Sequence, residues 1–333
     1  MTTLAEIART LTSGRVDPRL YPGALAGLIP VDLVLSLAAK RDYRLYRLWQ
    51  RYQEASKSLF DETAPAASAP VDPAILATLR ARGIVKLPAY PASDVSAALA
   101  WVEERAAAAV DKAAREIDPQ AKVDQLYWDE GRTRMHLDRR TSRMRLYLDA
   151  ADPERASWPH AIRDFFDVPS VHALAQEYFG THAIFPTQPY MMAEVLTRGP
   201  QIEPWHIDCV RQSVKAFLFL TDVGPANGPL RTQVGSHALD DRRHEWLYKI
   251  CNGGLGHAYF SEEDNARLDA TATTHLGPAG TLVVFDTQSL HASSFCSEGR
   301  RVVLVNGYRP ATTLRLNPRL FRDPRPVPHP WEK

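Results

Sequence analysis

The sequence predicts an antiparallel all-β core with flanking helices, arranged as a double-stranded β-helix or jelly roll and preceded by a helical N-terminal extension. Two observations predict this fold. After Ala183, short runs rich in β-branched and aromatic residues alternate with Gly, Pro and Asn. In the first third, apolar residues instead recur at helical spacing. Helices followed by many short strands are typical of a jelly roll with helices on one face.

The N-terminal part predicts an amphipathic helix over residues 34–59, because apolar residues recur there at helical spacing and basic residues occupy the rest of the wheel. We expect this helix to pack on its own domain, although such a helix can also bind a membrane surface or a partner. The next residues are rich in Ala, Pro and Ser and are typical of a linker. The chain is therefore divided into a helical N-terminal extension (1–62), a linker (63–73), a jelly-roll domain (74–315) and a C-terminal tail (316–333).

Local signals position the following elements. A helix over residues 72–82 should end at Gly83, and a short strand over residues 84–87 should end at Pro88. Ser93 or Asp94 is expected to cap a helix that continues to about Glu116. The strands expected in the last half are 184–196, 214–220, 281–285 and 302–308.

Composition excludes several classes of protein. The chain has 40 basic and 39 acidic residues and a formal charge of +1, so no overall field attracts nucleic acid or an anionic membrane. The three cysteines, Cys209, Cys251 and Cys296, are odd in number and scattered, which argues against a disulfide framework and for a reducing, cytoplasmic location. The most apolar stretch, residues 24–39, contains Pro30 and is too short for a membrane span, so we expect no stable membrane insertion.

A candidate metal site comes from residues that lie far apart in the sequence. Side chains at positions i and i+2 of an extended segment point to the same side, so His206 and Asp208 can face one point. His291, just past a distant apolar strand, can complete the facial arrangement of two imidazoles and one carboxylate found in non-haem Fe(II) oxygenases. Arg301 begins the next strand and can hold a carboxylate bidentately, as the distal carboxylate of 2-oxoglutarate requires.

Three further positions could contribute to the site. His136 and Asp138 repeat the H-x-D spacing without a comparable context, so we interpret His136 as a helix or loop residue near the pocket. His237, in a Gly-Ser-His turn, is expected to be a hydrogen-bonded scaffold residue. Gln188 either faces the pocket and donates to 2-oxoglutarate, or is a buried glutamine satisfied by backbone groups.

One dense basic run is present, and its first interpretation is a solvated face. Its members are Arg132, Arg134, Arg139, Arg140, Arg143 and Arg145. The alternative is that at least one of them binds a phosphate, a carboxylate or the tail of coenzyme A on the substrate. Arg231, before the Gly-Ser-His turn, is a further candidate for substrate contact.

Between Leu76 and Pro310 the sequence resembles the phytanoyl-CoA dioxygenase family of Fe(II)/2-oxoglutarate-dependent oxygenases. The resemblance rests on Gly83-Ile-Val-Lys-Leu-Pro, Trp205-His-Ile-Asp, Asn227-Gly-Pro-Leu, Gly235-Ser-His, His291 and Arg301, in this order. It implies that His206, Asp208 and His291 bind iron. It also implies that Arg301, or Arg300 beside it, binds 2-oxoglutarate, and that Ser293 contacts the same carboxylate.

The resemblance implies an enzyme that uses Fe(II), 2-oxoglutarate and O2. We expect it to hydroxylate an unactivated C–H bond of a small biosynthetic metabolite, with release of succinate and CO2. The alternatives are an acyl-CoA hydroxylase of the same family and a cupin-type metal enzyme that does not use 2-oxoglutarate. Desaturation, epimerisation and cyclisation also stay open, as does a homodimer contact through the N-terminal extension, whereas Asp208 argues against halogenation.

Overall fold

The computed structural model describes most of the chain between residues 39 and 310. The described residues are 39, 42–61, 66–67, 69–87, 92–116, 125–130, 133–138, 142–149, 152–166, 168–182, 184–186, 191–199, 203–208, 210–252 and 260–310. The predictions about Gln188, Cys209 and the C-terminal tail lie outside these ranges.

The described helices and strands alternate irregularly along the chain. The helices are α3 (Tyr43–Asp61), α4 (Pro73–Arg82), α5 (Ala92–Glu116), the 3-10 helix η3 (Pro153–Ser157), α6 (His160–Phe166), α7 (Pro169–Phe179), α8 (Asp241–Asn252) and α9 (Glu262–Thr271). The strands are β1 (Ile84–Leu87), β2 (Gln125–Glu130), β3 (Thr133–Asp138), β4 (Arg143–Tyr147), β5 (Ile184–Pro186), β6 (Met192–Thr197), β7 (Val214–Phe219), β8 (Leu230–Thr232), β9 (Thr273–His275), β10 (Leu282–Asp286), β11 (His291–Ser293) and β12 (Arg300–Pro310).

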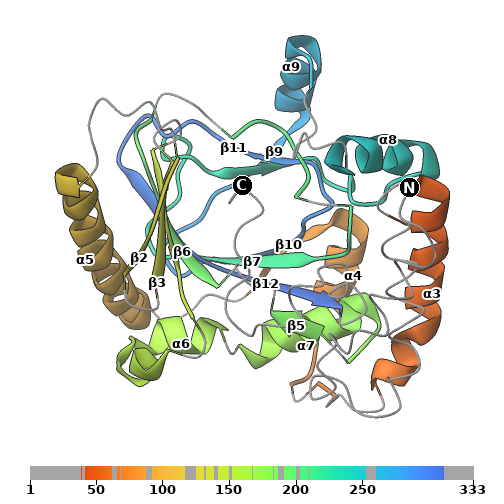
Figure 1. Cartoon of the computed structure of the whole chain (residues 1–333), viewed down its shortest axis with the longest axis horizontal. Helices are drawn as coiled ribbons and strands as arrows, with labels where there is room; N and C mark the ends of the chain where they lie inside the picture. The colour runs from red at the N-terminus through yellow and green to blue at the C-terminus, as the bar shows by residue number, and fades with distance from the viewer. Residues whose placement is uncertain are drawn as a thin grey trace, which may run out of the picture.

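Two antiparallel sheets form the core, which confirms the predicted jelly roll. The larger sheet has the strand order β1-β10-β7-β12-β6-β4-β3-β2, with β5 paired to one end of β12. The smaller sheet has the order β11-β8-β9. In Figure 1 the strands of the smaller sheet lie above β7, β10 and β12, and α6 and α7 lie below them. Apart from the consecutive strands β2, β3 and β4, most neighbours in the larger sheet are distant in the sequence, as in a double-stranded β-helix.

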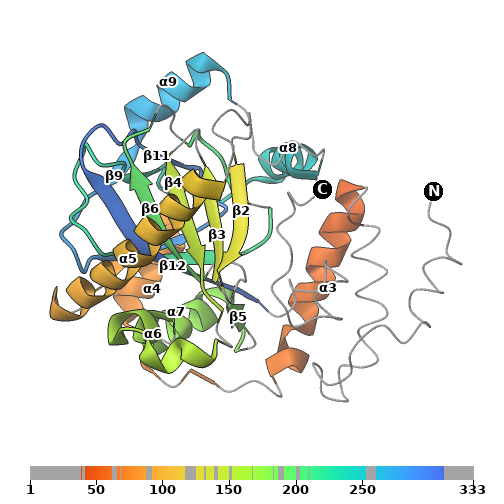
Figure 2. The ribbon, with the colours of Figure 1, turned by 60° about the vertical axis from the view of Figure 1, so that its left-hand side comes forward.

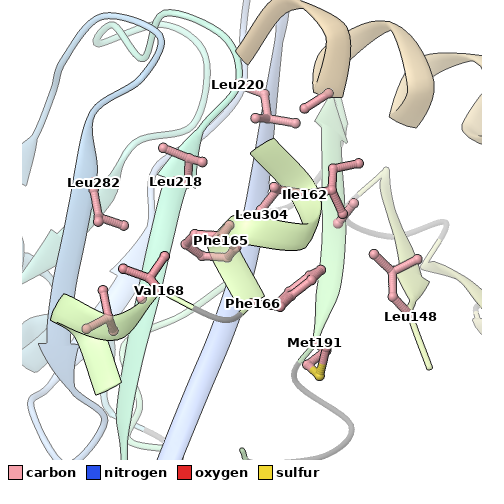
Figure 3. Packing of buried hydrophobic residues seen from close by; sticks show 14 of the residues in the cluster. Leu148, Ile162, Phe165, Phe166, Val168, Met191, Leu218, Leu220, Leu282 and Leu304 are labelled. Atoms are coloured by element: carbon pink, nitrogen blue, oxygen red, sulfur yellow. The ribbon is translucent and has the colours of Figure 1, made fainter. Parts of the chain in front are cut away.

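Helices cover the outer face of the larger sheet. Figure 2 shows α5 crossing this face beside α6 and α7. Apolar side chains from alternate strand positions meet the helices there, and Figure 3 shows Phe165 and Ile162 of α6 packed near Leu304, Leu218 and Leu282. These side chains are almost completely buried. Burial of each such side chain contributes roughly 1.5–3 kcal/mol, so this layer fixes the sheet that carries one wall of the site.

The opposite, inner face of the larger sheet holds a mixture of aromatic, aliphatic and charged side chains. Alternation places Phe217, Phe219 and Val303 inside, in a second buried cluster. Glu194 and Lys215 share this inner face by the same alternation and are also buried. Charged groups inside a β fold must be paired, and their position points to a site between the two sheets.

Two predictions about local structure are wrong. We expected the β-rich part of the chain to begin after Ala183, but three strands, β2 to β4, precede that residue. Their inner faces carry charged residues, so the apolar positions Met135, Met144 and Leu146 alternate with Arg and His instead of standing in an apolar run. In addition, α5 begins at Ala92, before the predicted caps Ser93 and Asp94.

Helix α3 of the N-terminal extension packs on the smaller sheet's outer side together with α8. Tyr46 and Trp49 of α3 belong to a buried cluster with Trp205, Ile207 and Leu290. The Tyr46 hydroxyl donates to the Val210 carbonyl over 2.6 Å. Among the described residues, no helix is both long enough and apolar enough to cross a membrane. The homodimer contact through this extension stays a prediction.

The turn from α4 into β1 depends on Gly83, which ends the helix with a φ of 71°. A Cβ at this position would lie 2.5 Å from Nδ1 of His237 and 2.6 Å from Oγ of Ser289. Gly83→Ala is therefore expected to lower the free energy of unfolding by about 3 kcal/mol, from backbone strain plus overpacking. Urea-induced unfolding measures this. Gly180→Ala is the matched control, because Gly180 also ends a helix at positive φ but has open space around it, and its loss should stay near 1 kcal/mol.

Candidate metal centre

The segment that contains His206 and Asp208 runs beside β11 and extends the smaller sheet. His206 and His291 exchange two backbone hydrogen bonds, each 2.9 Å long, and the Asp208 amide donates to the Thr287 carbonyl over 3.2 Å. Antiparallel pairing puts directly opposite residues on one face of a sheet. This pairing brings the three predicted ligands together across more than 80 residues of sequence.

Three side-chain atoms converge on one point. Oδ1 of Asp208 lies 3.9 Å from Nε2 of His206 and 3.8 Å from Nε2 of His291. The ligand atoms all lie within 4.8 Å of one another, and no other group of His, Cys, Asp or Glu in the described ranges is arranged in this way. An ion about 2 Å from each atom would fit between them. The two histidines are buried and Asp208 is half-buried, as a site shielded from bulk water requires.

Backbone carbonyls orient both imidazoles for metal binding. Nδ1 of His206 lies 2.7 Å from the Pro204 carbonyl, and Nδ1 of His291 lies 2.8 Å from the Ser289 carbonyl. A carbonyl only accepts, so each Nδ1 carries the proton and donates it. Each Nε2 is then left with a lone pair directed at the shared point. Histidine ligands in metalloproteins are held in the same way.

Electrostatics keeps His206 and Asp208 in their metal-binding protonation states. Burial, together with the neighbouring His291, lowers the pKa of His206 from 6.5 to about 4, so the ring is neutral near pH 7. Burial alone would raise the pKa of Asp208, but Lys215 and the two histidines outweigh it, and the net pKa lies well below the usual range. Two neutral imidazoles and one carboxylate are the donors that divalent iron takes in oxygenases, so the residues fit such an ion.

The lowered pKa of His206 predicts a pH dependence of stability in the metal-free protein. Between pH 6.5 and 4 the unfolded chain binds a proton at this histidine that the folded chain does not, so acidification destabilises the fold. From pH 7 to pH 5 the contribution is about 2 kcal/mol. Urea unfolding with a chelator present should therefore show a loss about 2 kcal/mol larger in the unsubstituted protein than in His206→Gln. Equal losses in the two proteins would contradict the assignment.

The structure distinguishes Arg301 from Arg300. Arg301 points inward and is 3% exposed, whereas Arg300 is half exposed and forms an ion pair with Glu103 on α5. Arg301 donates to the Gly228 carbonyl and, over 2.7 Å, to Glu194. Its buried Nε has no hydrogen-bond partner among the described residues. Arg301 is thus the arginine that faces the site, and it retains a donor for a bound carboxylate.

Glu194 of β6 is the centre of a buried ionic network. It contacts Arg301, Arg145 over 3.0 Å and Arg143 over 3.4 Å. Burial alone would raise the pKa of Glu194, but the three arginines lower it to about 2. Breaking a buried pair costs several kcal/mol, so this network holds the arginines in place.

Ser293 lies at the junction between this network and the metal site. Its Oγ accepts from Arg143 over 3.2 Å and from the Glu203 amide over 3.3 Å. Arg143 also forms an ion pair with the Glu203 carboxylate, whose Oε1 lies 3.8 Å from Nε2 of His206. With Ser293 accepting twice, its own hydroxyl hydrogen remains to be donated to a ligand.

The remaining candidates take structural positions. His136 lies in strand β3, not in a helix or loop as expected, and its ring stacks on Tyr127 at 4.3 Å. His237 lies apart from the metal ligands, with Nε2 2.9 Å from the Arg80 carbonyl. Arg231 forms an ion pair with Asp269 over 2.6 Å and lies over the Trp205 ring. Cys296 is a buried free cysteine.

Sequence reasoning missed Glu194, Glu203 and Lys215 and misread Arg143, whose side chain is buried, not part of a solvated face. Arg132, Arg139 and Arg140 of the same run lie outside the described residues. One signal was available for two of the missed residues. Glu194 and Lys215 are single charges inside otherwise apolar strands, which is typical of residues that point into a polar site.

The fold and the site define a jelly-roll protein in which three side chains could hold a metal ion and an arginine faces the same interior. A sequence profile of the family described as "Phytanoyl-CoA dioxygenase (PhyH)" matches residues 83–302. The chain belongs to this family and is a 2-oxoglutarate-dependent dioxygenase, which uses Fe(II), 2-oxoglutarate and O2. The alternative of a cupin-type enzyme without 2-oxoglutarate is therefore wrong.

Solved structures of low similarity share parts of the fold. The enzyme EctD from S. alaskensis with 2-oxoglutarate and 5-hydroxyectoine is 17% identical, with a TM-score of 0.46 over 81% of this chain and 86% of that chain. The non-haem α-ketoglutarate-dependent epimerase SnoN from nogalamycin biosynthesis is 20% identical, with a TM-score of 0.42 over 72% and 85%. EvdMO1 is 18% identical, with a TM-score of 0.43 over 72% of this chain and only 50% of that chain. No curated protein sequence matches the chain.

Proposed function

We propose that this dioxygenase hydroxylates an unactivated C–H bond of a small biosynthetic metabolite, with release of succinate and CO2. The convergence of His206, Asp208 and His291 beside the inward-facing Arg301 is the observation that carries this proposal. The three side chains would hold Fe(II) through Nε2, Oδ1 and Nε2. Iron held in this way would activate O2, the oxidant: the keto acid and the C–H bond each give up two electrons, so that one oxygen atom enters succinate and the other enters the hydroxylated product.

The protein's own side chains bind and orient the reactants. Arg301 receives the distal carboxylate of 2-oxoglutarate through its remaining N–H donors, and the Ser293 hydroxyl donates to the same group. Gln188 stays a prediction for a third contact. Four cations, Arg143, Arg145, Arg301 and Lys215, face three carboxylates, Glu194, Glu203 and Asp208, in this part of the interior. With the metal, this excess of positive charge suits a dianionic co-substrate.

The charge pairing also supports a small substrate over an acyl-CoA. Coenzyme A carries several phosphate charges and needs free cations, and no recognised CoA-binding motif is present in the sequence. The candidates for that role were the arginines of the basic run. Two of them, the buried Arg143 and the half-buried Arg145, are already paired with Glu203 and Glu194.

Screening by mass shift tests the proposal. The purified protein is incubated with Fe(II), 2-oxoglutarate and O2 and with a panel that contains small natural products and acyl-CoA thioesters. We expect one or more small metabolites to gain a single oxygen atom, with succinate formed in equal amount. Oxygen gain on an acyl-CoA alone would establish the acyl-CoA alternative. Loss of two hydrogens without oxygen gain would indicate desaturation or cyclisation.

A further inference from the structure

Lys215 is a buried cation in a strand that is otherwise apolar. It stands in the β7 sequence Val-Lys-Ala-Phe-Leu-Phe, and its side chain is 10% exposed. Its neighbours across the larger sheet are Phe285 of β10 and Gly307 of β12. An ammonium group is strongly hydrated, so placing it here costs several kcal/mol unless an anion compensates it. The compensating anion identifies the role of the lysine.

That anion is the carboxylate of the proposed iron ligand. Nζ of Lys215 lies 2.8 Å from Oδ2 of Asp208. The other oxygen, Oδ1, is the one that lies 3.8–3.9 Å from Nε2 of His206 and of His291. The two oxygens of one carboxylate are therefore divided, one towards the metal position and one towards the lysine. Glu194 and Glu203 form ion pairs with arginines, whereas Asp208 forms one with Lys215.

This division determines how many positions the carboxylate can occupy on the metal. An octahedral ion bound by two imidazoles and one carboxylate oxygen keeps three positions, of which 2-oxoglutarate needs two and O2 needs one. A carboxylate that binds through both oxygens takes one of these three. An ammonium group at hydrogen-bond distance from Oδ2 prevents this, because Oδ2 cannot serve the lysine and the metal equally well.

We propose that Lys215 is a positioning residue that restricts Asp208 to one-oxygen coordination and so preserves the third open position on the metal. This inference rests on the proposed function, since it requires a metal at the His206, Asp208 and His291 atoms. Lys215 lies opposite Phe285 in the sheet, and the ring centroids of Phe285 and His291 are 5.2 Å apart. The lysine, the phenylalanine and two of the ligands thus form one packed unit.

Binding measurements without turnover test this role. Wild-type protein, Lys215→Met and Lys215→Arg are loaded with Co(II) under anaerobic conditions, and the visible absorption bands report the coordination of the ion. In Lys215→Met we expect an altered Co(II) spectrum and a dissociation constant for 2-oxoglutarate raised by about tenfold to a hundredfold, while Co(II) itself binds at least as tightly. Lys215→Arg keeps a cation at Oδ2 and should restore both the spectrum and the affinity.

Control variants distinguish the role of Lys215 from the existence of the metal site. Lys86→Met removes an exposed lysine from β1, which is separated from β7 by β10. Lys86 donates to the Leu276 carbonyl, and its removal should change neither quantity. Lys215→Leu, which also lacks a donor, is measured if Lys215→Met does not fold without metal. A wild-type spectrum and wild-type affinity in Lys215→Met, or in Lys215→Leu where that variant replaces it, would overturn the role of Lys215. Wild-type protein that binds no Co(II) would instead overturn the proposed metal site.

Discussion

Replacing His206 with Ala is expected to reduce 2-oxoglutarate turnover by about a thousandfold or more, equivalent to ~4 kcal/mol of lost transition-state stabilisation. The reason is geometric. Its Nε2 is one of three atoms that face a single point, and the backbone carbonyl of Pro204 holds the ring in that orientation. With one imidazole and one carboxylate left, iron would bind weakly and in variable geometry. Succinate formation and iron content after dialysis are the two measurements.

His160→Ala is the control for this substitution. His160 lies on α6 with 76% of its side chain exposed, near Asp164 and away from the metal ligands. It should retain wild-type iron content and wild-type turnover. If His206→Ala kept its iron and its succinate formation, the proposed centre would be wrong, and the ion would have to be sought elsewhere in the chain.

The second large effect concerns the co-substrate. Arg301→Ala is expected to raise the KM for 2-oxoglutarate by roughly a hundredfold or more, because a buried charge-assisted pair is lost while the carboxylate remains to be bound. The fold should survive, since Glu194 keeps its contacts with Arg143 and Arg145. Initial rates of succinate formation at varied 2-oxoglutarate concentration measure the effect, and metal content should not change.

Two further variants make this test specific. Arg300→Ala removes the adjacent arginine, whose exposed ion pair with Glu103 contributes about 1 kcal/mol or less, and should leave the KM unchanged. Arg301→Lys keeps the charge but loses the planar fork, so we expect partial recovery only. A raised KM in Arg300→Ala together with a normal KM in Arg301→Ala would transfer the role to Arg300.

The metal ligands could be predicted from sequence because they lie on two short segments, each of which has a recognisable local pattern. His206 and Asp208 share a face through the two-residue period of an extended segment, and His291 follows a strand whose apolar pattern is unmistakable. What sequence could not supply is the pairing that joins the pieces. The register of His206 opposite His291 results from the packing of both sheets, not from either segment alone.

Strands β2 to β4 were not predicted, and the reason is physical. A typical strand of a β sandwich has an apolar inner side and a polar outer side, but here the outer side meets helices α5 and α6 and the inner side lines the site. In β4, Met144 and Leu146 therefore face the helices while Arg143 and Arg145 face Glu194. Apolar and charged residues do alternate, but the apolar ones face outward and the charged ones face inward. In the sequence, the charged residues resemble those of a solvated loop. Glu194 and Lys215 were not predicted as site residues for the same reason, because they too are charged residues on the inner face of a sheet.

The hydrogen bond between Tyr46 and Val210 links α3 to the segment that carries two of the proposed iron ligands. Val210 follows Asp208 by two residues, and the α3 side chains share a buried cluster with Trp205 and Ile207, which flank His206. The family match begins only at residue 83. A chain shortened to that match would keep every side chain assigned to iron and lose the helix that supports their backbone from behind. We therefore expect a working enzyme to need α3, a segment that lies before the residues matched by the family profile.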